Sequence, residues 1–218
     1  MTEKNNSNLF HQYMKTLQPE AVILANGLFP THPIPLTVLQ RAKYLCCCDG
    51  AAANLQRKPD AIVGDGDSLS PSLKEYYKDI IHTESEQEYN DLTKATRFCL
   101  EQGFRHIAYV GATGKREDHT LGNISLMAYY KKLGVEPVFL TDYGCLTVHK
   151  GYHELLTFKG QQVSIFNISC SELSGEGLKW NLSPYHSFWQ GTLNEATGEK
   201  IMLHGDGIFM VFRNYDAE

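Results

Sequence analysis

Five aspartates have the spacing of a cation site. Asp49, Asp65 and Asp67 come directly after short apolar runs, Asp118 lies in the loop after another run, and Asp91 begins a segment of helical spacing. Carboxylates that converge on one edge of a sheet raise each other's pKa values unless a cation neutralises them. Oxygen ligands without a His or Cys pair favour a hard ion such as Mg²⁺. The alternative is that each Asp merely caps a turn or a helix.

The most informative of these segments is GDGDS at residues 64–68. Its two carboxylates, Asp65 and Asp67, flank a glycine, which lets the backbone approach a ligand closely. Two carboxylates in this arrangement can share one metal ion. A tight turn without a function is the alternative for this pentapeptide.

A second candidate is GATGKREDH at residues 111–119, between an apolar run and a helical pattern. Backbone N–H groups of such a loop and of a helix N-terminus bind anions, and Arg116 can donate two parallel hydrogen bonds to a phosphate. The segment is not a Walker A loop, because the four-residue spacer and the Ser or Thr after the lysine are missing. A surface role for Arg116 and a helix-terminal role for His119 are the alternatives.

These loops require a sheet whose strands end at one edge. Five short apolar runs, each followed by a turn containing Gly or Asp, are expected strands: residues 21–25, 44–48, 61–63, 107–110 and 138–140. Helix-length segments lie between them: residues 51–57, 73–78, 91–102 and 118–133. The alternation predicts an α/β fold with a mostly parallel, Rossmann-like sheet flanked by helices. Ligands of such sheets bind beyond the carboxyl ends of the strands, where the strand order reverses.

The pattern changes beyond about Gly144, where helical spacing disappears. The expected strands there are residues 153–158, 162–168, 187–193, 200–204 and 208–213, and the glycines of residues 205–207 predict a tight hairpin between the last two. The sequence therefore predicts an α/β domain over residues 1–147 and a smaller all-β sandwich or barrel over residues 148–218.

Composition excludes several classes of protein. The 218 residues are 42% hydrophobic and carry a net charge of −5, so the basic surface of a nucleic-acid binder is not expected. No apolar run reaches the roughly 18 residues of a membrane span, and the N-terminal sequence lacks a signal-peptide pattern. Cys46, Cys47 and Cys48 are consecutive, which does not suit a disulfide framework. We expect a cytoplasmic protein with reduced thiols.

Five motifs in order resemble the thiamin pyrophosphokinase family, and together they are specific although each alone is weak. They are DGAAAN at residues 49–54, GDGDS at residues 64–68, QEYNDLTK at residues 87–94, GATGKREDHTLGN at residues 111–123 and GLKWNL at residues 177–182. The resemblance covers the chain from about residue 21 to residue 213. It implies transfer of a pyrophosphoryl group from ATP to the hydroxyl of thiamin, with Mg²⁺ as cofactor.

The resemblance also implies a role for each matching residue. The metal ligands would be Asp65, Asp67 and Asp91. The ATP-binding positions would be Asp49, Gln87, Asn90, Lys94, Thr113, Gly114, Lys115, Arg116, Asp118 and His119. The thiamin-binding positions would be Trp180, Thr192 and Asn194, and the thiamin site would lie between the subunits of a homodimer. A core position in the β-domain is the alternative for Trp180.

Phosphoryl transfer depends on positioning and on cancelling negative charge. We expect Arg116 to cancel charge, and Asp67 or Asp91 either to accept the proton of the attacking hydroxyl or to position that hydroxyl. The chain departs from the family at Lys115, where Gly is usual, and at Leu193, where Ser is usual. Lys115 could add a phosphate contact. Two other functions fit the same residues: a Mg²⁺-dependent phosphohydrolase and a catalytically silent thiamin or nucleotide sensor.

Overall fold

The structure is a computed structural model that describes residues 9–86 and 88–216. The chain forms two compact units, one of residues 18–142 and the other of residues 9–17 together with residues 143–216. Among the described residues, no helix combines the length and the apolar character needed to cross a membrane.

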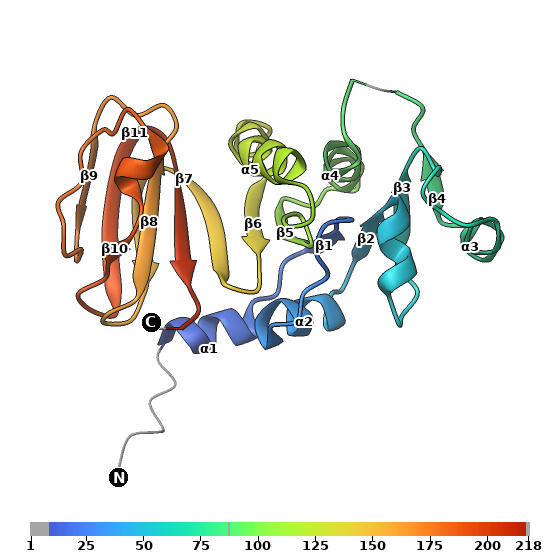
Figure 1. Ribbon diagram of the computed structural model, residues 1–218, viewed down its shortest axis with the longest axis horizontal. Helices are drawn as coiled ribbons and strands as arrows, with labels where there is room; N and C mark the ends of the chain where they lie inside the picture. The colour runs from blue at the N-terminus through green and yellow to red at the C-terminus, as the bar shows by residue number, and fades with distance from the viewer. Residues whose placement is uncertain (1–8, 87, 217–218) are drawn as a thin grey trace, which may run out of the picture. The chain divides into compact units, whose positions relative to one another are not determined.

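The first unit contains a parallel sheet. Its strands are β1 (Ala21–Leu24), β2 (Leu45–Cys48), β3 (Ala61–Gly64), β4 (Ile81–Thr83), β5 (His106–Val110) and β6 (Glu136–Leu140). They lie side by side in the order β6-β5-β1-β2-β3-β4, and every pair is parallel (Figure 1). All residues of β1, β2 and β3 are buried, as expected for strands covered on both faces. The five predicted strands of this unit are confirmed.

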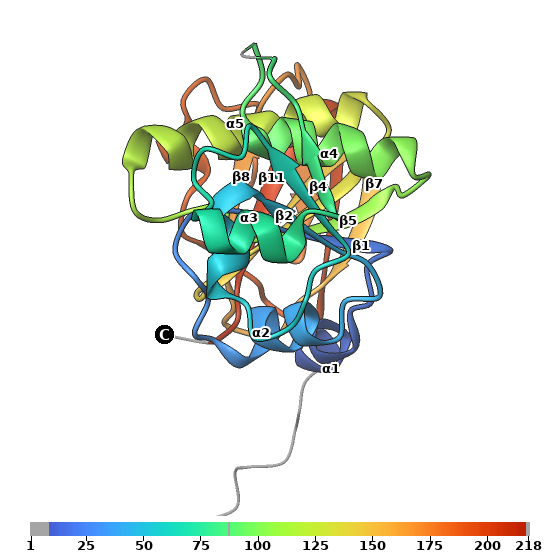
Figure 2. The ribbon, with the colours of Figure 1, turned by 90° about the vertical axis from the view of Figure 1, so that its right-hand side faces the viewer.

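Helices cover both faces of this sheet. They are α2 (Pro33–Gln40), α3 (Pro71–Tyr77), α4 (Asp91–Glu101) and α5 (Glu117–Lys132), with a 3₁₀ helix η1 (Asp49–Asn54). Figures 1 and 2 show α4 and α5 on one face of the strands and α2 on the other. Helix α4 packs on β1, β2 and β3 because its buried residues recur with helical spacing: Leu92, Ala95, Thr96 and Cys99. The Asn90 side chain caps its N-terminus by accepting a hydrogen bond from the Thr93 N–H.

The predicted helix over residues 51–57 is wrong, because the chain forms only the 3₁₀ helix η1 there. Two further elements of this unit were not predicted. Helix α2 has Pro33 and Pro35 in its first turn, where a missing N–H does no harm, although prolines normally signal a break. Strand β4 is only three residues long and partly exposed, so its sequence carries little hydrophobic pattern.

The second unit is built on antiparallel strands: β7 (Gly144–Leu156), β8 (Gln162–Asn167), β9 (Leu173–Glu176), β10 (Asn194–Glu195) and β11 (Lys200–Asn214). Strand β11 pairs with β7 along one edge and with both β8 and β9 along the other, and β10 pairs with β8. Its core is a cluster of ten buried residues: Leu155, Val163, Ile165, Cys170, Leu173, Ala196, Ile201, Leu203, Phe209 and Val211.

The predicted hairpin at residues 205–207 is wrong, because β11 is one continuous strand with a register shift between Gly205 and Ile208. The glycines serve close packing instead of chain reversal. A Cβ atom on Gly207 would lie 2.2 Å from the Ser169 carbonyl oxygen, and one on Gly205 would lie 2.8 Å from the Cys170 sulfur. The shift is a bulge at which β11 changes its partner from β9 to β8.

The predicted strand over residues 187–193 is also wrong. Residues Phe188–Gly191 form a 3₁₀ helix, η2. A capping box explains its start: the Ser187 side chain accepts a hydrogen bond from the backbone of Gln190, and the Gln190 side chain accepts one from the Ser187 N–H.

Helix α1 (Leu9–Thr16) groups with the C-terminal unit, whereas the predicted domain over residues 1–147 includes it. Packing explains the grouping. The Phe10 ring lies 6.1 Å from the Phe158 ring, and the Arg213 guanidinium lies 5.3 Å above Phe10. Phe10 and Met14 form the buried side of the helix.

Candidate functional site

A cavity opens at the carboxyl edge of the parallel sheet. Strand β1 has β2 on one side and β5 on the other, so the strand order reverses between β1 and β5. The cavity measures about 380 Å³, within the usual range for ligand sites. Six residues with a predicted nucleotide or metal role line it: Asn90, Asp91, Gly114, Lys115, Arg116 and His119.

The loops after β1 and β5 approach closely at Gly27. The Gly27 N–H donates to the Gly111 carbonyl oxygen at 2.7 Å, and the Leu28 N–H donates to the Thr113 oxygen at 2.9 Å. A Cβ atom on Gly27 would lie 2.3 Å from the Gly111 oxygen and 2.5 Å from the Thr113 oxygen. Only glycine fits this position, and Thr113 contributes its backbone to the frame of the cavity.

Asp49 lies directly after β2 and is 2% exposed. Its Oδ2 accepts a hydrogen bond from the Ser68 N–H at 2.8 Å, whereas its buried Oδ1 has no hydrogen-bond partner among residues 9–86 and 88–216. The backbone adopts a φ of +28° at this residue, and Gly64 leaves room for it, because a Cβ there would lie 2.8 Å from the Asp49 Cβ. The strand ends thus hold a buried carboxylate oxygen that lacks a donor.

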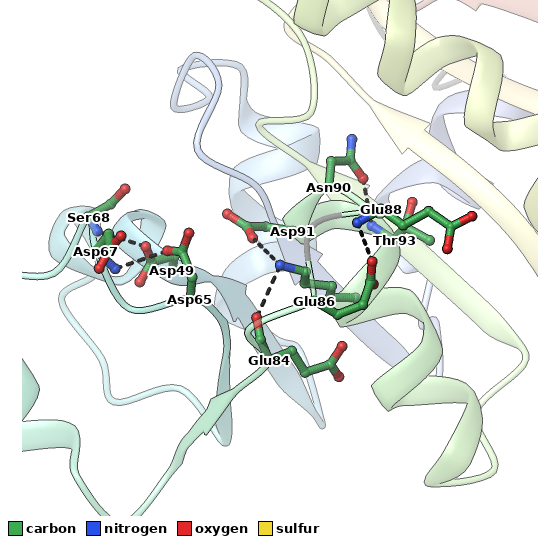
Figure 3. A network of polar contacts seen from close by, with 11 residues as sticks. Asp49, Asp65, Asp67, Ser68, Glu84, Glu86, Glu88, Asn90, Asp91 and Thr93 are labelled. Carbon is green, nitrogen blue, oxygen red and sulfur yellow. Dashed lines mark hydrogen bonds and ion pairs between the residues drawn. The ribbon is translucent and has the colours of Figure 1, made fainter.

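Asp65 and Asp67 lie on the turn after β3. The Asp65 Oδ1 accepts a hydrogen bond from the Asp67 N–H at 3.0 Å, and Gly66 between them has a φ of +80°. This is the compact turn that the GDGDS sequence predicts. Figure 3 shows Asp49, Asp65 and Asp67 gathered at the ends of β2 and β3, with Asp91 between them and Asn90.

Asp91 is the first residue of α4. The charges of Asp49 and Asp65 act on its carboxylate. Burial raises its pKa, Lys94 opposes the rise, and the charges of Asp65 and Asp49 add to it. The Lys94 ammonium lies 3.8 Å from the Asp91 Oδ1 and donates to the Glu84 carbonyl oxygen at 3.1 Å. Lys94 is itself buried, and its two contacts connect the start of α4 to residue 84. It is not among the residues that line the cavity.

The acidic residues fit an open cation site more than a closed one. Within residues 9–86 and 88–216, no three His, Cys, Asp or Glu side chains are placed to hold a metal between them. The orphaned Asp49 Oδ1 and the mutual repulsion of Asp49, Asp65 and Asp91 nevertheless favour a hard cation. Mg²⁺ commonly takes one or two protein carboxylates and completes its shell with water and phosphate oxygens. The donor set therefore fits Mg²⁺.

Asp118 lies apart from that cluster in its contacts, although its sequence position suggested that it would join the same rim. Its Oδ1 accepts from the Arg116 Nε at 3.0 Å and from the His119 N–H at 2.9 Å. The hydrogen bond from Arg116 lowers the pKa of Asp118 to about 2. Asp118 thus holds the Arg116 guanidinium beside the start of α5.

Hydrogen bonds within the GATGKREDHTLGN segment use part of its predicted anion-binding capacity. The Gly114 N–H donates to the Thr120 Oγ1 at 3.0 Å, so this N–H serves the start of α5. The Asn90 Nδ2 donates to the Asn123 Oδ1 at 3.1 Å, and the Asn123 Nδ2 donates to the Ala112 oxygen at 2.7 Å. This chain of amides fixes α4 to the loop after β5. Gln87 lies outside the described residues.

The predicted thiamin-side residues lie in the second unit. The Asn194 Nδ2 donates to the Trp180 carbonyl oxygen at 2.9 Å, and its Oδ1 accepts from the Trp180 N–H at 3.2 Å. Trp180 is 52% exposed, which excludes a core position, and the Lys179 ammonium lies 4.8 Å from its ring. The Thr192 hydroxyl donates to the Trp189 oxygen at 2.7 Å. Asn194 therefore holds Trp180, and Thr192 stabilises the end of η2.

Sequence reasoning missed Asn26, which lines the cavity and accepts hydrogen bonds from Lys115. The signal was present in the sequence, because Asn26-Gly27 ends the first predicted strand, next to the point where the sheet order reverses. Ser68 and Asn123 also line the cavity and belong to segments that the sequence had marked.

The fold and the cavity define a class of protein: an α/β chain with a charged ligand site at the switch point of a parallel sheet. Comparison with known proteins identifies the family within this class. Residues 36–139 match the family model "Thiamin pyrophosphokinase, catalytic domain", and residues 144–212 match "Thiamin pyrophosphokinase, substrate-binding domain".

Individual relatives belong to the same family as these two models. Thiamin pyrophosphokinase 1 of Caenorhabditis elegans is 34% identical over 185 residues, which cover 75% of this chain and 75% of the relative. Thiamine pyrophosphokinase 1 of Oryza sativa subsp. japonica is 29% identical over 225 residues, covering 85% and 83%.

Solved structures share the fold. Thiamin pyrophosphokinase from Candida albicans superposes with a TM-score of 0.75 at 21% identity, covering 94% of this chain and 90% of that one. The enzyme from Geobacillus thermodenitrificans superposes with a TM-score of 0.73 at 25% identity, covering 91% and 98%. The chain belongs to the thiamin pyrophosphokinase family, as its five motifs indicated.

Proposed function

We propose that the chain transfers a pyrophosphoryl group from ATP to thiamin. The hydroxyethyl oxygen of thiamin attacks the β-phosphorus and loses its proton. The bond from the β-phosphorus to the oxygen shared with the α-phosphorus breaks, and AMP leaves with that oxygen. The products are AMP and thiamin diphosphate. The family membership supports this reaction. The charged cavity at the switch point is the observation that supports this cavity as the place of the reaction.

We assign the acidic side of the site to Mg²⁺, with Asp65, Asp67 and Asp91 as ligands and Asp49 behind them. The assignment is supported by the buried Asp49 Oδ1 without a donor and by the raised pKa of Asp91, to which Asp65 and Asp49 contribute. When bound, Mg²⁺ would neutralise charge on the phosphate oxygens. The carboxylates of Asp67 and Asp91 are the candidates to accept or position the hydroxyl proton of thiamin.

The cavity lining also includes basic side chains. Arg116 and Lys115 line the cavity together with His119 and Asp91, so a polyphosphate bound there would meet two cationic side chains and one of the proposed metal ligands. We propose that Arg116 binds phosphate oxygens and cancels charge in the transition state, while Asp118 keeps its guanidinium oriented through the bonds described above.

On the thiamin side, Trp180 offers an exposed aromatic face to a cationic ring. Such a contact contributes about 0.5–2 kcal/mol, depending on desolvation. Asn194 supports it by fixing the Trp180 backbone on both its N–H and its carbonyl oxygen. This unit also exposes other large apolar side chains close in sequence: Phe188, Trp189 and Leu193. Such exposure suits an interface, and we propose a homodimer with thiamin bound between subunits.

Product analysis tests the function and separates it from its two rivals. Purified protein is mixed with ATP and Mg²⁺, with and without thiamin, and the products are identified by mass spectrometry. The proposal predicts AMP and thiamin diphosphate in equal amounts, and only when thiamin is present. Inorganic phosphate without thiamin would indicate a phosphohydrolase, and the absence of turnover would indicate a sensor.

The dimer is tested separately by light scattering after size-exclusion chromatography. We expect about twice the 24.6 kDa mass of the chain, and a Trp189→Asp variant should shift the protein toward the monomer. A wild-type protein that elutes at the mass of one chain would contradict the dimer without affecting the reaction.

A further inference from the structure

Lys115 and Asn26 connect the two loops that meet at the switch point. The Lys115 ammonium donates to the Asn26 carbonyl oxygen at 3.0 Å and to the Asn26 Oδ1 at 3.3 Å. Asn26 follows β1 and Lys115 follows β5, and both line the cavity. The contact therefore fixes where a flexible lysine side chain places its charge.

Both bonds from Lys115 end on neutral oxygens. The ammonium forms no ion pair with any carboxylate of the described residues, whereas neighbouring Arg116 is paired with Asp118. An ammonium has three N–H donors, so one remains after the two bonds to Asn26. A positive charge without a carboxylate partner and with a spare donor, in the wall of a cavity, suits an anionic ligand.

The backbone at Lys115 adds a second observation. Its φ is +63°, directly after Gly114 at +79°. A residue with a side chain adopts this left-handed conformation at a cost in free energy, and such positions cluster at ligand sites. The chain has a lysine at a position whose backbone conformation favours glycine. The backbone geometry does not explain this lysine, which indicates a role for its side chain.

We propose that Asn26 is a positioning residue that holds the Lys115 ammonium in the cavity wall, with its third N–H available to a phosphate oxygen of the nucleotide. The inference rests on the proposed function, which supplies the nucleotide, and deepens it by assigning Asn26. Because Lys115 acts as a point charge held by the protein, it contributes to nucleotide affinity without a divalent metal.

The experiment measures ATP affinity by calorimetry in EDTA, where no transfer occurs, for wild type, Lys115→Met, Asn26→Ala and the double variant. Lys132→Met is the matched control, because it removes the same charge from an exposed position on α5 outside the cavity lining. Circular dichroism melting verifies that each variant is folded. Steady-state KM and kcat with Mg²⁺ and thiamin provide an independent readout.

We expect Lys115→Met to weaken ATP binding about tenfold, as for loss of a hydrogen bond from a charged group. Asn26→Ala keeps the backbone acceptor, so we expect about a threefold loss, seen mainly as a higher KM for ATP with a smaller change in kcat. In the Lys115→Met background the Asn26→Ala change should have no further effect, because Asn26 acts through Lys115. Lys132→Met should bind ATP as the wild type does.

Three results would overturn the inference. The first is an unchanged ATP affinity in Lys115→Met. The second is an Asn26→Ala effect of equal size with and without Lys115, and the third is a loss in Lys132→Met as large as in Lys115→Met. Failure of the proposed function is distinguishable, because it would remove thiamin diphosphate formation by the wild type while leaving the pattern of ATP affinities measurable.

Discussion

Asp49 shows how the surroundings of one buried side chain can indicate a cation site. A buried polar atom without a partner costs about 1–3 kcal/mol, and among the described residues the Asp49 Oδ1 is such an atom. Burial raises the pKa of Asp91, and the charges of Asp65 and Asp49 add to that rise. The sequence predicted an acidic cluster from residue types alone. It could not indicate that Asp49 is the buried member, because burial depends on the fit between η1 and the turn after β3.

This cluster predicts a metal-dependent stability. Millimolar Mg²⁺ should raise the unfolding temperature of the wild type by about 2–4 °C for each kcal/mol of binding free energy, because it neutralises carboxylates that repel each other. Asp65→Asn and Asp91→Asn should reduce that rise, and EDTA should reverse it. Differential scanning fluorimetry provides the measurement.

Asp118→Asn is the control for the metal prediction, since Asp118 is bonded to Arg116 and His119. It should keep the Mg²⁺-dependent rise. Equal loss of the rise in Asp118→Asn and Asp91→Asn would refute the assignment of the metal to the ends of β2, β3 and α4.

The Asp118 carboxyl also gives a pH prediction. Its pKa is lowered to about 2, chiefly by the hydrogen bond from Arg116. A lowered pKa means that the folded state binds the proton less well than the unfolded state, so the stabilisation is present above the ordinary aspartate pKa of 3.8. It is lost as the pH falls toward about 2.

The measurement is a carboxyl-carbon NMR titration of Asp118. In the wild type the midpoint should lie near 2, and in Arg116→Gln it should move toward 3.8. A midpoint that does not respond to the substitution would show that Arg116 does not hold Asp118 in solution.

At the scale of elements, two glycines test whether the cavity depends on the close approach of the loops after β1 and β5. Gly27→Ala should destabilise the protein by about 1–3 kcal/mol, because its Cβ would meet the Gly111 and Thr113 oxygens at 2.3 and 2.5 Å. Gly122 on α5 has open space around it, so Gly122→Ala should stabilise by up to about 1 kcal/mol.

Urea unfolding of both variants provides the comparison. Gly27→Ala should also weaken ATP binding, since it displaces a loop of the cavity, and Gly122→Ala should not. Equal stability of Gly27→Ala and wild type would mean that the two loops do not meet as closely as their hydrogen bonds indicate.

Buried strands were the elements that the sequence predicted well. Strands β1, β2 and β3 are continuous apolar runs ended by turn residues, and both signals are local. The failures have non-local causes. Gly205 and Gly207 predicted a hairpin, but their small size accommodates residues 169–170 of a distant segment. The apolar residues of η2 predicted a strand, although Ser187 and Gln190 cap a helical turn there.

At the scale of the whole molecule, the two substrates should depend on different parts of the chain. Trp180→Ala should raise the KM for thiamin about tenfold, as for loss of a cation–π contact of about 1–2 kcal/mol. Asn194→Ala should raise it as well, because it releases the Trp180 backbone. Both should leave the KM for ATP nearly unchanged.

Steady-state kinetics with each substrate varied in turn provides the test, and Lys132→Met should change neither KM. An Asn194→Ala variant that binds thiamin as tightly as the wild type would contradict the supporting role of Asn194. The sequence indicated these thiamin-side positions only through family resemblance, because nothing in their local pattern distinguishes a ligand contact from a hydrogen bond to the backbone.

The central claim is attack of the thiamin hydroxyl on the β-phosphorus of ATP with release of AMP, and an isotope experiment tests it most directly. ATP that carries ¹⁸O in the bridge between the α- and β-phosphorus is incubated with the protein, Mg²⁺ and thiamin. The masses of the products are then determined by mass spectrometry. Attack at the β-phosphorus predicts ¹⁸O in AMP and thiamin diphosphate without the label. Labelled thiamin diphosphate, or AMP and inorganic phosphate formed without thiamin, would contradict the account.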